Sequence, residues 1–460
     1  MKSAVPHGIV DKYQMSGKKS ILVTLYKKGD AMECGNYRTI ALTSLMGKVL
    51  MVILNDRLGN QTEEHLADEQ AGFRRDRSTV QQILALRLIA EEARRKDKKI
   101  YNCFVDFQKA FDSINQNITW AVLRSYGVDG KLIRLLQDAN SKALAVVRIG
   151  GEIGPWFSIS RGTRQGDPSS PRVFITHLER AMDRVKQKDE GVSIHGMWIN
   201  NLRFADDIDL IEENEQRLER TVQILNEDGK RYGLQMNFEK TKRMVFGGKY
   251  IVNKIIVEGI KLDNVEKFTY LGCNMTFDLD CKKEIVVMLS KATAILNYMD
   301  KIWRSKDISI SVKVNILKTS VFSSALYGCG AWVLHKETER RILAFERKCY
   351  RKILQITWLQ KIRNEEVYNR IPEKENLMQK VIQRKLRLFG HICRMSDDRK
   401  IKSLVFGIMD GESRVGRPHK EWVDDITDWC GGTLQDLYHI AQDRWQWSKM
   451  VGVASDTYGR

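Results

Sequence analysis

The sequence predicts an α+β fold, in which strands and helices are mixed over about the first 280 residues and helices follow almost alone. Before residue 280, short β-branched and aromatic runs alternate with longer runs that have apolar residues at helical spacing. After about residue 282 the helical spacing continues nearly unbroken. With 460 residues and 43% hydrophobic residues, the chain can bury a sizeable core, and we expect two to four domains.

In the first 140 residues, the predicted strands are the short apolar runs bounded by turn residues, and the predicted helices are the longer periodic runs. The strands are expected at 21–26, before the turn KKGD, and at 100–107. The helices are expected at 42–58, 79–95, 114–126 and 129–140.

In the next 140 residues, strands are predicted around the Gly150–Gly151 turn, at 143–151 and 156–160, and on both sides of residues 205–207, at 202–204 and 208–211. A helix is expected at 213–232, and another at 172–185. The second is amphipathic and should bury Phe174, Leu178, Ala181, Met182 and Val185.

The charge balance points to a polyanionic partner. Lys and Arg total 76 against 58 Asp and Glu, a formal net charge of +18, and nucleic acid is the usual partner of such a chain. Residues 340–402 hold 18 basic and 7 acidic side chains, a local net of 18 − 7 = +11. The aromatic residues of this segment either stack on bases or belong to a helical core; they are Tyr350, Trp358, Tyr368 and Phe389.

Targeting, membrane and disulfide signals are missing from the sequence. The longest mostly apolar uncharged stretch, 319–334, is shorter than the roughly 20 residues that span a bilayer, so we expect a buried helix ending near its glycines. The eight cysteines form no C-x-x-C pair and are expected to be reduced thiols of a soluble intracellular protein, nuclear or cytoplasmic. A zinc site at His391, Cys393 and Cys430 is the disfavoured alternative.

Three carboxylates carry the chemical prediction. Asp106 lies among apolar neighbours in FVDF, and Asp206 and Asp207 lie between two short strands. Aspartate is common in turns, which is the plain explanation of the pair. If Asp106 meets the pair in space, however, the three repelling carboxylates form an oxygen-rich site for Mg²⁺, as in two-metal polymerases and nucleases. The residues alone leave that meeting open.

Seven segments in a fixed order resemble the reverse transcriptase of non-LTR (LINE-type) retrotransposons. They are NYRTIALTS (36–44), DEQAGFRRDRSTVQQI (68–83), FVDFQKAFDSI (104–114), GTRQGDPSSP (162–171), FADD (204–207), GLQMNFEKTKRMVF (233–246) and FTYLG (268–272). Downstream, ALYGCGAW (325–332), RLFGHICRM (387–395) and GRPHKEW (416–422) are similar to the C-terminal regions of one branch of these elements. An upstream endonuclease is absent, so a fragment or truncated reading frame is expected.

The resemblance implies a right-hand polymerase that holds two Mg²⁺ ions, with Mn²⁺ as an alternative. Asp106 and Asp206 would be metal ligands and Asp207 the second acid of the catalytic turn. A lysine near the leaving pyrophosphate, the proposed proton donor, matches Lys240 in preference to Lys242.

The resemblance also assigns substrate contacts. Arg74 and Arg77 match the finger residues that hold the incoming triphosphate, and a solvated basic loop is the alternative. Phe111 matches the ring that excludes a ribose 2′-hydroxyl, and core packing is its alternative role. Gln165 and Gly166 match the loop beside the nascent base pair, where a missing Cβ lets backbone approach the template or nucleotide.

Tyr270, Leu271 and Gly272 match the primer grip that supports the 3′ end. Asp112 is either a further site residue or the N-cap of the following helix. The implied domains are fingers at 1–99, palm with insertions at 100–280, a helical thumb at 281–370 and a basic nucleic-acid-binding extension at 371–460.

The predicted function is therefore RNA-directed DNA polymerisation, with an RNA template, a DNA primer or target and dNTPs as partners. The alternative is an inactive nucleic-acid-binding relic of such an element. A two-metal nuclease shares the carboxylates, but that function does not explain Phe111, the RQG loop or the downstream lysine.

Overall fold

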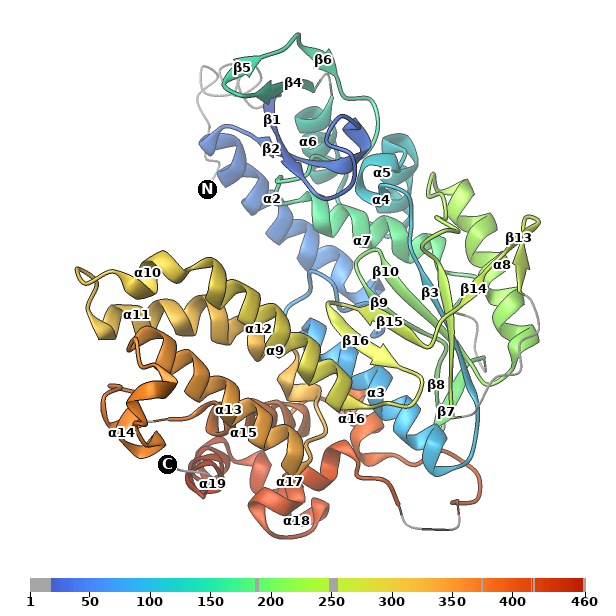
Figure 1. Cartoon of the computed structure of the whole chain (residues 1–460). Coiled ribbons are helices and arrows are strands. Elements are labelled where there is room, and N and C mark those ends of the chain that lie inside the picture. The colour runs from blue at the N-terminus through green and yellow to red at the C-terminus, as the bar shows by residue number, and fades with distance from the viewer. Residues whose placement is uncertain are drawn as a thin grey trace, which may run out of the picture.

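The computed structural model describes residues 18–141, 143–186, 190–247, 255–373, 375–414, 416 and 418–457. Figure 1 shows a small sheet with helices at the N-terminal side, a second sheet beside it, and a large helical region that contains the C-terminal half of the chain. The predicted order, mixed α and β followed by α, is confirmed.

The N-terminal sheet has the order β2-β1-β4-β5, with β6 paired to β4. Strands β1 and β4 are parallel and the other neighbours are antiparallel. The strands are β1 Lys19–Tyr26, β2 Tyr37–Leu42, β4 Leu144–Ile149, β5 Glu152–Ile153 and β6 Phe157–Ser158. Strand β2 was not predicted, because a helix was expected to begin at residue 42; β2 instead takes its conformation from pairing with β1 along its whole length.

The helices of the first 181 residues agree with the prediction except at their ends and at α4, which was not predicted. They are α2 Leu45–Thr62, α3 Thr79–Arg95, α4 Ala110–Ser113, α5 Gln116–Ser125, α6 Gly130–Asn140 and α7 Ser170–Ala181. Side-chain caps fix the starts of α2 and α3, where Ser44 and Ser78 accept hydrogen bonds from backbone N–H groups of the first turn. Helix α7 ends four residues before the predicted end, although all five residues expected to point inward are buried.

The second sheet has the order β14-β11-β3-β10-β9. Its strands are β3 Ile100–Val105, β9 Asn201–Phe204, β10 Asp207–Glu212, β11 Lys242–Phe246 and β14 Asp263–Asn264. All neighbours are antiparallel except β11 and β14. One face packs on α7 and on α8 Glu215–Arg231 through Val105 and Ile208. The opposite face, through Phe104, packs on α3 and the helical region.

Three short hairpins complete the β structure, and none of them was predicted. They are β7 Val192–Ile194 with β8 Met197–Ile199, β12 Ile256–Val257 with β13 Ile260–Lys261, and β15 Lys267–Tyr270 with β16 Cys273–Thr276. Strands of two to four residues are too short for a period-two pattern to be recognised.

The helical region contains α9 Cys281–Tyr298, α10 Asp300–Arg304, α11 Ile310–Ile316, α12 Ser323–Ala325, α13 Lys336–Ile353, α14 Asn364–Asn369, α15 Leu377–Cys393, α16 Lys400–Phe406, α17 Trp422–Cys430, α18 Leu434–Gln442 and α19 Arg444–Asp456. A π-helical turn, Leu317–Phe322, joins α11 to α12, and the helix ends before Gly328, whose φ is 72°. Side chains from α3, α9, α13, α15 and α17 to α19 share one core.

All eight cysteines are free thiols, and six of them are buried. No helix among the described residues is long and apolar enough to cross a bilayer. Among the same residues His391, Cys393 and Cys430 do not form a metal-binding group, so the disfavoured zinc site finds no support.

Candidate active site

A cavity of about 810 Å³ lies beside the end of β3 and beside β2. It gathers residues that are far apart in the sequence but belong to the matched segments. Of the residues singled out from the sequence, Asp106, Phe111, Asp112, Gln165, Asp206 and Lys240 line it.

The register of the second sheet brings the three carboxylates together. Val105 pairs with Ile208 in antiparallel register, so the next position outward on β3 is Asp106 and on β10 is Asp207. Asp206 lies in the tight turn between β9 and β10, after Ala205, which has a φ of 59°. The meeting of strands that the sequence left open is therefore present.

Gln70 holds this turn in place, although the sequence analysis did not select it. Its side chain is fully buried; Oε1 accepts hydrogen bonds from the N–H groups of Ala205 (2.9 Å) and Gly72 (2.8 Å), and Nε2 donates to the Ala205 carbonyl (3.3 Å). The only sequence signal for Gln70 is its place inside the matched segment DEQAGF, because a polar residue by itself is expected at the surface.

The electrostatics confirm that the carboxylates act on one another. Burial, and then the charges of Asp206 and Asp106, raise the pKa of Asp207 to about 6. Burial and the Asp106 charge also raise the pKa of Asp206, while its own backbone N–H and Arg38 act in the opposite direction. The Oδ2 atom of Asp106 is buried and has no hydrogen-bond partner among the described residues.

These donors have the chemistry that a hard divalent cation needs: carboxylate oxygens, one of them buried and without a hydrogen bond, in a group that is destabilised by mutual repulsion. Within the described part of the chain, no three His, Cys, Asp or Glu side chains stand as a ready metal-binding group. The donor set thus fits a metal, while its ligand shell is not formed in advance.

Of the two lysines considered, Lys240 lies at the cavity and Lys242 does not. The Nζ atom of Lys240 is 3.5 Å from Oδ2 of Asp106, and its side chain is 65% exposed. Lys242, at the start of β11, forms an ion pair of 2.7 Å with Asp263. The geometry agrees with the preference for Lys240.

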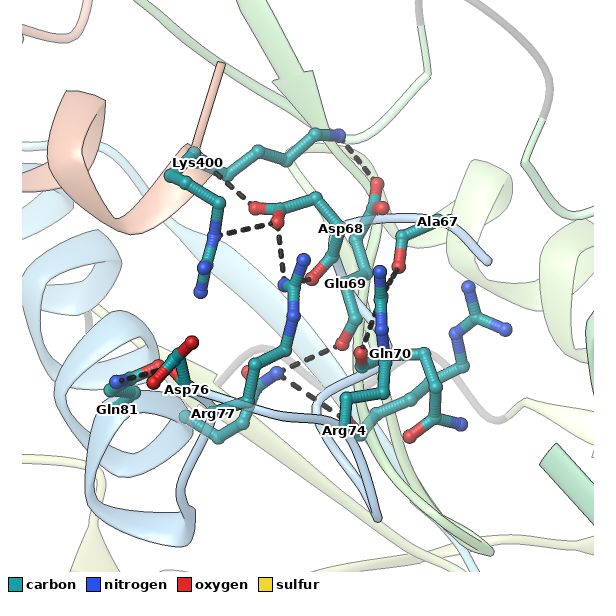
Figure 2. A network of polar contacts seen from close by, with 12 residues as sticks. Ala67, Asp68, Glu69, Gln70, Arg74, Asp76, Arg77, Gln81 and Lys400 are labelled. Atoms are coloured by element: carbon teal, nitrogen blue, oxygen red, sulfur yellow. Dashed lines mark hydrogen bonds and ion pairs between the residues drawn. The ribbon is translucent and has the colours of Figure 1, made fainter. Parts of the chain in front are cut away.

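Arg74 and Arg77 lie outside the cavity, in a buried polar network (Figure 2). Their side chains are 5% and 9% exposed. Arg74 donates to Glu63 (2.8 Å) and to two backbone carbonyls, and Arg77 forms an ion pair with Asp68 (2.5 Å). Neither guanidinium is free for a triphosphate in this conformation, and neither belongs to a solvated loop.

The same network ties the N-terminal loop to the C-terminal region. Asp68 also forms an ion pair with Arg399 (2.9 Å) and accepts a hydrogen bond from the N–H of Lys400 (2.8 Å). The ammonium of Lys400 binds Glu69, as Figure 2 shows. Three basic residues from two distant segments therefore share two neighbouring carboxylates.

The cationic side chains that do line the cavity come from other positions. Arg38 on β2 is exposed there, and its charge opposes the rise that burial causes in the pKa of Asp206 and of Asp112. The other basic lining residues of the described chain, besides Lys240, are Lys27, Lys109 and Arg161. Arg38 was missed, although it stands inside the matched segment NYRTIALTS.

Phe111 lies both at the cavity and against the core. It is half-buried and lines the cavity, and its ring stacks on Phe174 at 4.1 Å between centroids. Asp112, also at the cavity, is inside α4 and caps neither helix: Lys109 precedes α4, and Asn115 caps α5. The N-cap interpretation of Asp112 was therefore wrong.

Gln165 lines the cavity, but Gly166 serves the fold. Gly166 has a φ of +107°, and a Cβ placed there would lie 2.8 Å from the Ala41 carbonyl oxygen. The Gln165 carbonyl accepts a hydrogen bond from the Ala41 N–H (2.7 Å). In this structure the backbone that approaches Gly166 is that of β2.

Tyr270, Leu271 and Gly272 form the turn of the β15–β16 hairpin and do not line the described cavity. Leu271 and Gly272 have φ values of 46° and 84°. Tyr270 is buried against Phe104, and its hydroxyl has no hydrogen-bond partner among the described residues. Tyr327 donates to the Leu271 carbonyl (2.9 Å), which fixes the hairpin on the helical region.

Comparisons with known proteins identify the family of the chain. Residues 25–275, more than half of the chain, match the family model described as reverse transcriptase (RNA-dependent DNA polymerase). The chain is 29% identical over 258 residues to a Pol polyprotein of the type-1 retrotransposable element R2 from Popillia japonica, a match that covers 54% of this chain and 36% of the relative. It is 20% identical to the RNA-directed DNA polymerase of the mobile element jockey from Drosophila funebris, over 77% of this chain and 39% of that one.

The chain thus spans between a quarter and two fifths of these retrotransposon relatives. Among solved structures, apo telomerase from Candida tropicalis is similar with a TM-score of 0.44 and 13% identity, over 89% of this chain and 71% of that chain. The resemblance to non-LTR retrotransposon polymerases that the motifs predicted is confirmed by the family match and these relatives.

Proposed function

The chain belongs to the reverse transcriptase (RNA-dependent DNA polymerase) family, and from this premise we propose that it synthesises DNA on an RNA template for a non-LTR retrotransposon. A primer 3′-hydroxyl would attack the α-phosphate of a dNTP; a phosphodiester bond forms and pyrophosphate leaves. The observation that carries the proposal is the convergence of Asp106 and Asp206 at one cavity that basic side chains also line, with Asp207 beside them at the start of β10.

Asp106 and Asp206, with Asp207, would hold two divalent cations, Mg²⁺ or Mn²⁺. When bound, such ions stabilise charge on the attacking and leaving oxygens. The support from this chain is the raised pKa of Asp206 and Asp207, which comes first from burial and then from the charge of neighbouring carboxylates, and a cation offsets both.

Each of the remaining cavity residues would contact a different part of the substrate. Lys240 would donate a proton to the leaving pyrophosphate, since its ammonium already lies beside Asp106. Arg38 would bind the triphosphate in place of Arg74 and Arg77, since a guanidinium offers phosphate paired donors. Phe111 would pack against C2′ of the sugar and leave no room for a 2′-hydroxyl.

We retain the division into fingers (1–99), palm (100–280), thumb (281–370) and basic extension (371–460) as part of the proposal. The thumb and extension share a core with α3, so they would hold the template and primer as one body. Contacts there would be mainly to backbone phosphates. Gly166 and the 270–272 hairpin would support the site from outside the cavity.

The test is primer extension on an RNA template with dNTPs and Mg²⁺. The wild-type chain should extend the primer and Asp206→Asn should not, with a loss of at least about 10³-fold. Asp263→Asn, which removes an exposed carboxylate outside the cavity, is the matched control and should retain activity. Thermal unfolding of each variant shows whether it is folded.

Two observations favour the alternative of a nucleic-acid-binding relic. Arg74 and Arg77 are held in internal contacts, and the described carboxylates do not form a ready metal-binding group. A folded wild-type chain that binds RNA tightly but extends no primer, at any Mg²⁺ or Mn²⁺ concentration, would establish the relic and overturn the polymerase.

A further inference from the structure

An exposed tryptophan lies in the most basic part of the helical region. From Arg347 to Arg363 the sequence has six basic residues and no acidic ones. This stretch includes the end of α13 and the loop that joins it to α14, and Figure 1 shows α14 at the outer edge of the helical region, away from the second sheet. The loop carries Trp358, which is 82% exposed, and Leu359, which is 67% exposed.

Trp358 differs in this respect from the other aromatic residues of the segment. Tyr350 and Phe389 are fully buried in the core, and Tyr368 packs against that core and donates to Glu346. Three of the four aromatic residues noted in the sequence are thus accounted for by packing. Trp358 has no such role.

The exposure of Trp358 occurs on an ordered loop. The turn Trp358–Gln360 is closed by a capping box between Thr357 and Gln360. Arg351 on α13 anchors the far side of the loop by donating to the Ile362 carbonyl (2.7 Å). Because the loop is already anchored, little conformational entropy is lost when the indole binds a partner.

We propose that Trp358 and Leu359 form a contact site for single-stranded nucleic acid, in which the indole stacks on an unpaired base. Lys361 and Arg363, both exposed, would neutralise the adjacent phosphates; within the described chain neither forms an ion pair. The inference deepens the proposed function and rests on it for the class of partner, since a polymerase must hold template that has not yet been copied.

Two physical arguments select this partner. A run of six cations without an acid favours a polyanion over a typical protein surface. A ring can stack only on a base whose face is open, which a single strand offers along its length and a duplex offers only at its ends. We therefore expect preference for a single strand over a blunt duplex of equal length.

The experiment measures binding of the full chain to a fluorescent single-stranded RNA and to the matching blunt duplex, by anisotropy, in EDTA without dNTPs. Trp358→Ala should weaken single-strand binding at least about fivefold, and Trp358→Phe should retain most of it. Trp156→Ala is the matched control: Trp156 is 46% exposed beside Lys19 at the N-terminal sheet, outside the proposed thumb and extension, and its removal should leave binding unchanged.

The phosphate contacts have a separate readout. Replacing Lys361 and Arg363 together with Ala should reduce the slope of log affinity against log salt by about 1.4 for a single strand. Binding is measured without dNTPs or a divalent cation, so a chain that does not polymerise still tests this inference.

The inference is overturned if Trp358→Ala binds single-stranded RNA as tightly as Trp156→Ala. It is also overturned if Trp358→Ala leaves RNA binding intact but lowers binding to phosphatidylserine vesicles, or changes the sedimentation of the chain, because the loop would then serve a membrane or a protein partner.

Discussion

The ammonium of Lys240 lies 3.5 Å from Oδ2 of Asp106, whereas Lys242, two residues later, pairs at 2.7 Å with Asp263 on β14. The turn before β11 therefore sends one lysine to the cavity and the next into the sheet edge. Because Asp106 Oδ2 has no hydrogen-bond partner among the described residues, Lys240 is its nearest recorded counter-charge.

Lys240→Ala should lower kcat for primer extension by about 10²-fold, the usual contribution of a positioned proton donor. Lys242→Ala removes an equal charge outside the cavity and should stay within a few-fold of wild type. Single-turnover extension rates measure both. Equal losses in the two variants would show that net charge, and not the position beside Asp106, determines the effect.

Arg38→Ala should raise the KM for dNTP about tenfold, because one charge-assisted contact to phosphate is lost, while the melting temperature stays near that of wild type. Arg77→Ala should instead destabilise the fold by about 3 kcal/mol, because it leaves Asp68 with one guanidinium fewer in a buried network. Steady-state kinetics and urea unfolding separate the two. A raised KM in a fully stable Arg77→Ala variant would reverse the assignment.

Phe111→Val should increase incorporation of ribonucleotides relative to deoxynucleotides by about tenfold, since the smaller side chain leaves space at C2′. The ratio of kcat/KM values for rNTP and dNTP is the measurement. Phe174→Leu is the control, because Phe174 stacks on Phe111 from inside the core. It should lower stability without changing the ratio; a change of equal size would assign discrimination to packing.

Much of the fold was predictable because its elements follow their own periodicity. Helix α3 was predicted to the residue, and β3 and β10 were found from short apolar runs. Strand β2 and the three hairpins were missed because their conformation depends on a paired strand and not on a pattern of their own.

The sequence predicted those site residues whose role is local. The prediction failed for residues whose role depends on the fold. Asp106, Asp206, Lys240 and Phe111 reach the cavity from the segments that suggested them. Arg74 and Arg77 do not, because Glu63 and Asp68 hold them in a network in which Asp68 is also bound by Arg399, about 330 positions later. No sequence spacing encodes a contact over that separation.

Glu91 provides a pH-dependent test of the packing between α3 and the C-terminal helices. Burial raises the pKa of its carboxyl to about 7, although Arg87 and the Trp422 N–H that it accepts oppose the rise. The folded state then binds more protons than the unfolded state between pH 4.5 and 7. Stability should therefore fall as pH rises through this window, by up to about 3 kcal/mol.

Glu91→Gln removes this titration and keeps an acceptor for Trp422. Relative to the wild type, the free energy of unfolding of the variant should therefore increase as pH rises from 4.5 to 7.5. Urea midpoints at a series of pH values measure the difference. Glu92→Gln, at the next position, breaks an ion pair with Arg95, and its free energy of unfolding should not increase relative to the wild type over the same pH range. If Glu91→Gln instead loses stability toward pH 7.5, the carboxylate is a stabilising anion there, and the α3 interface rests on its pairing with Arg87.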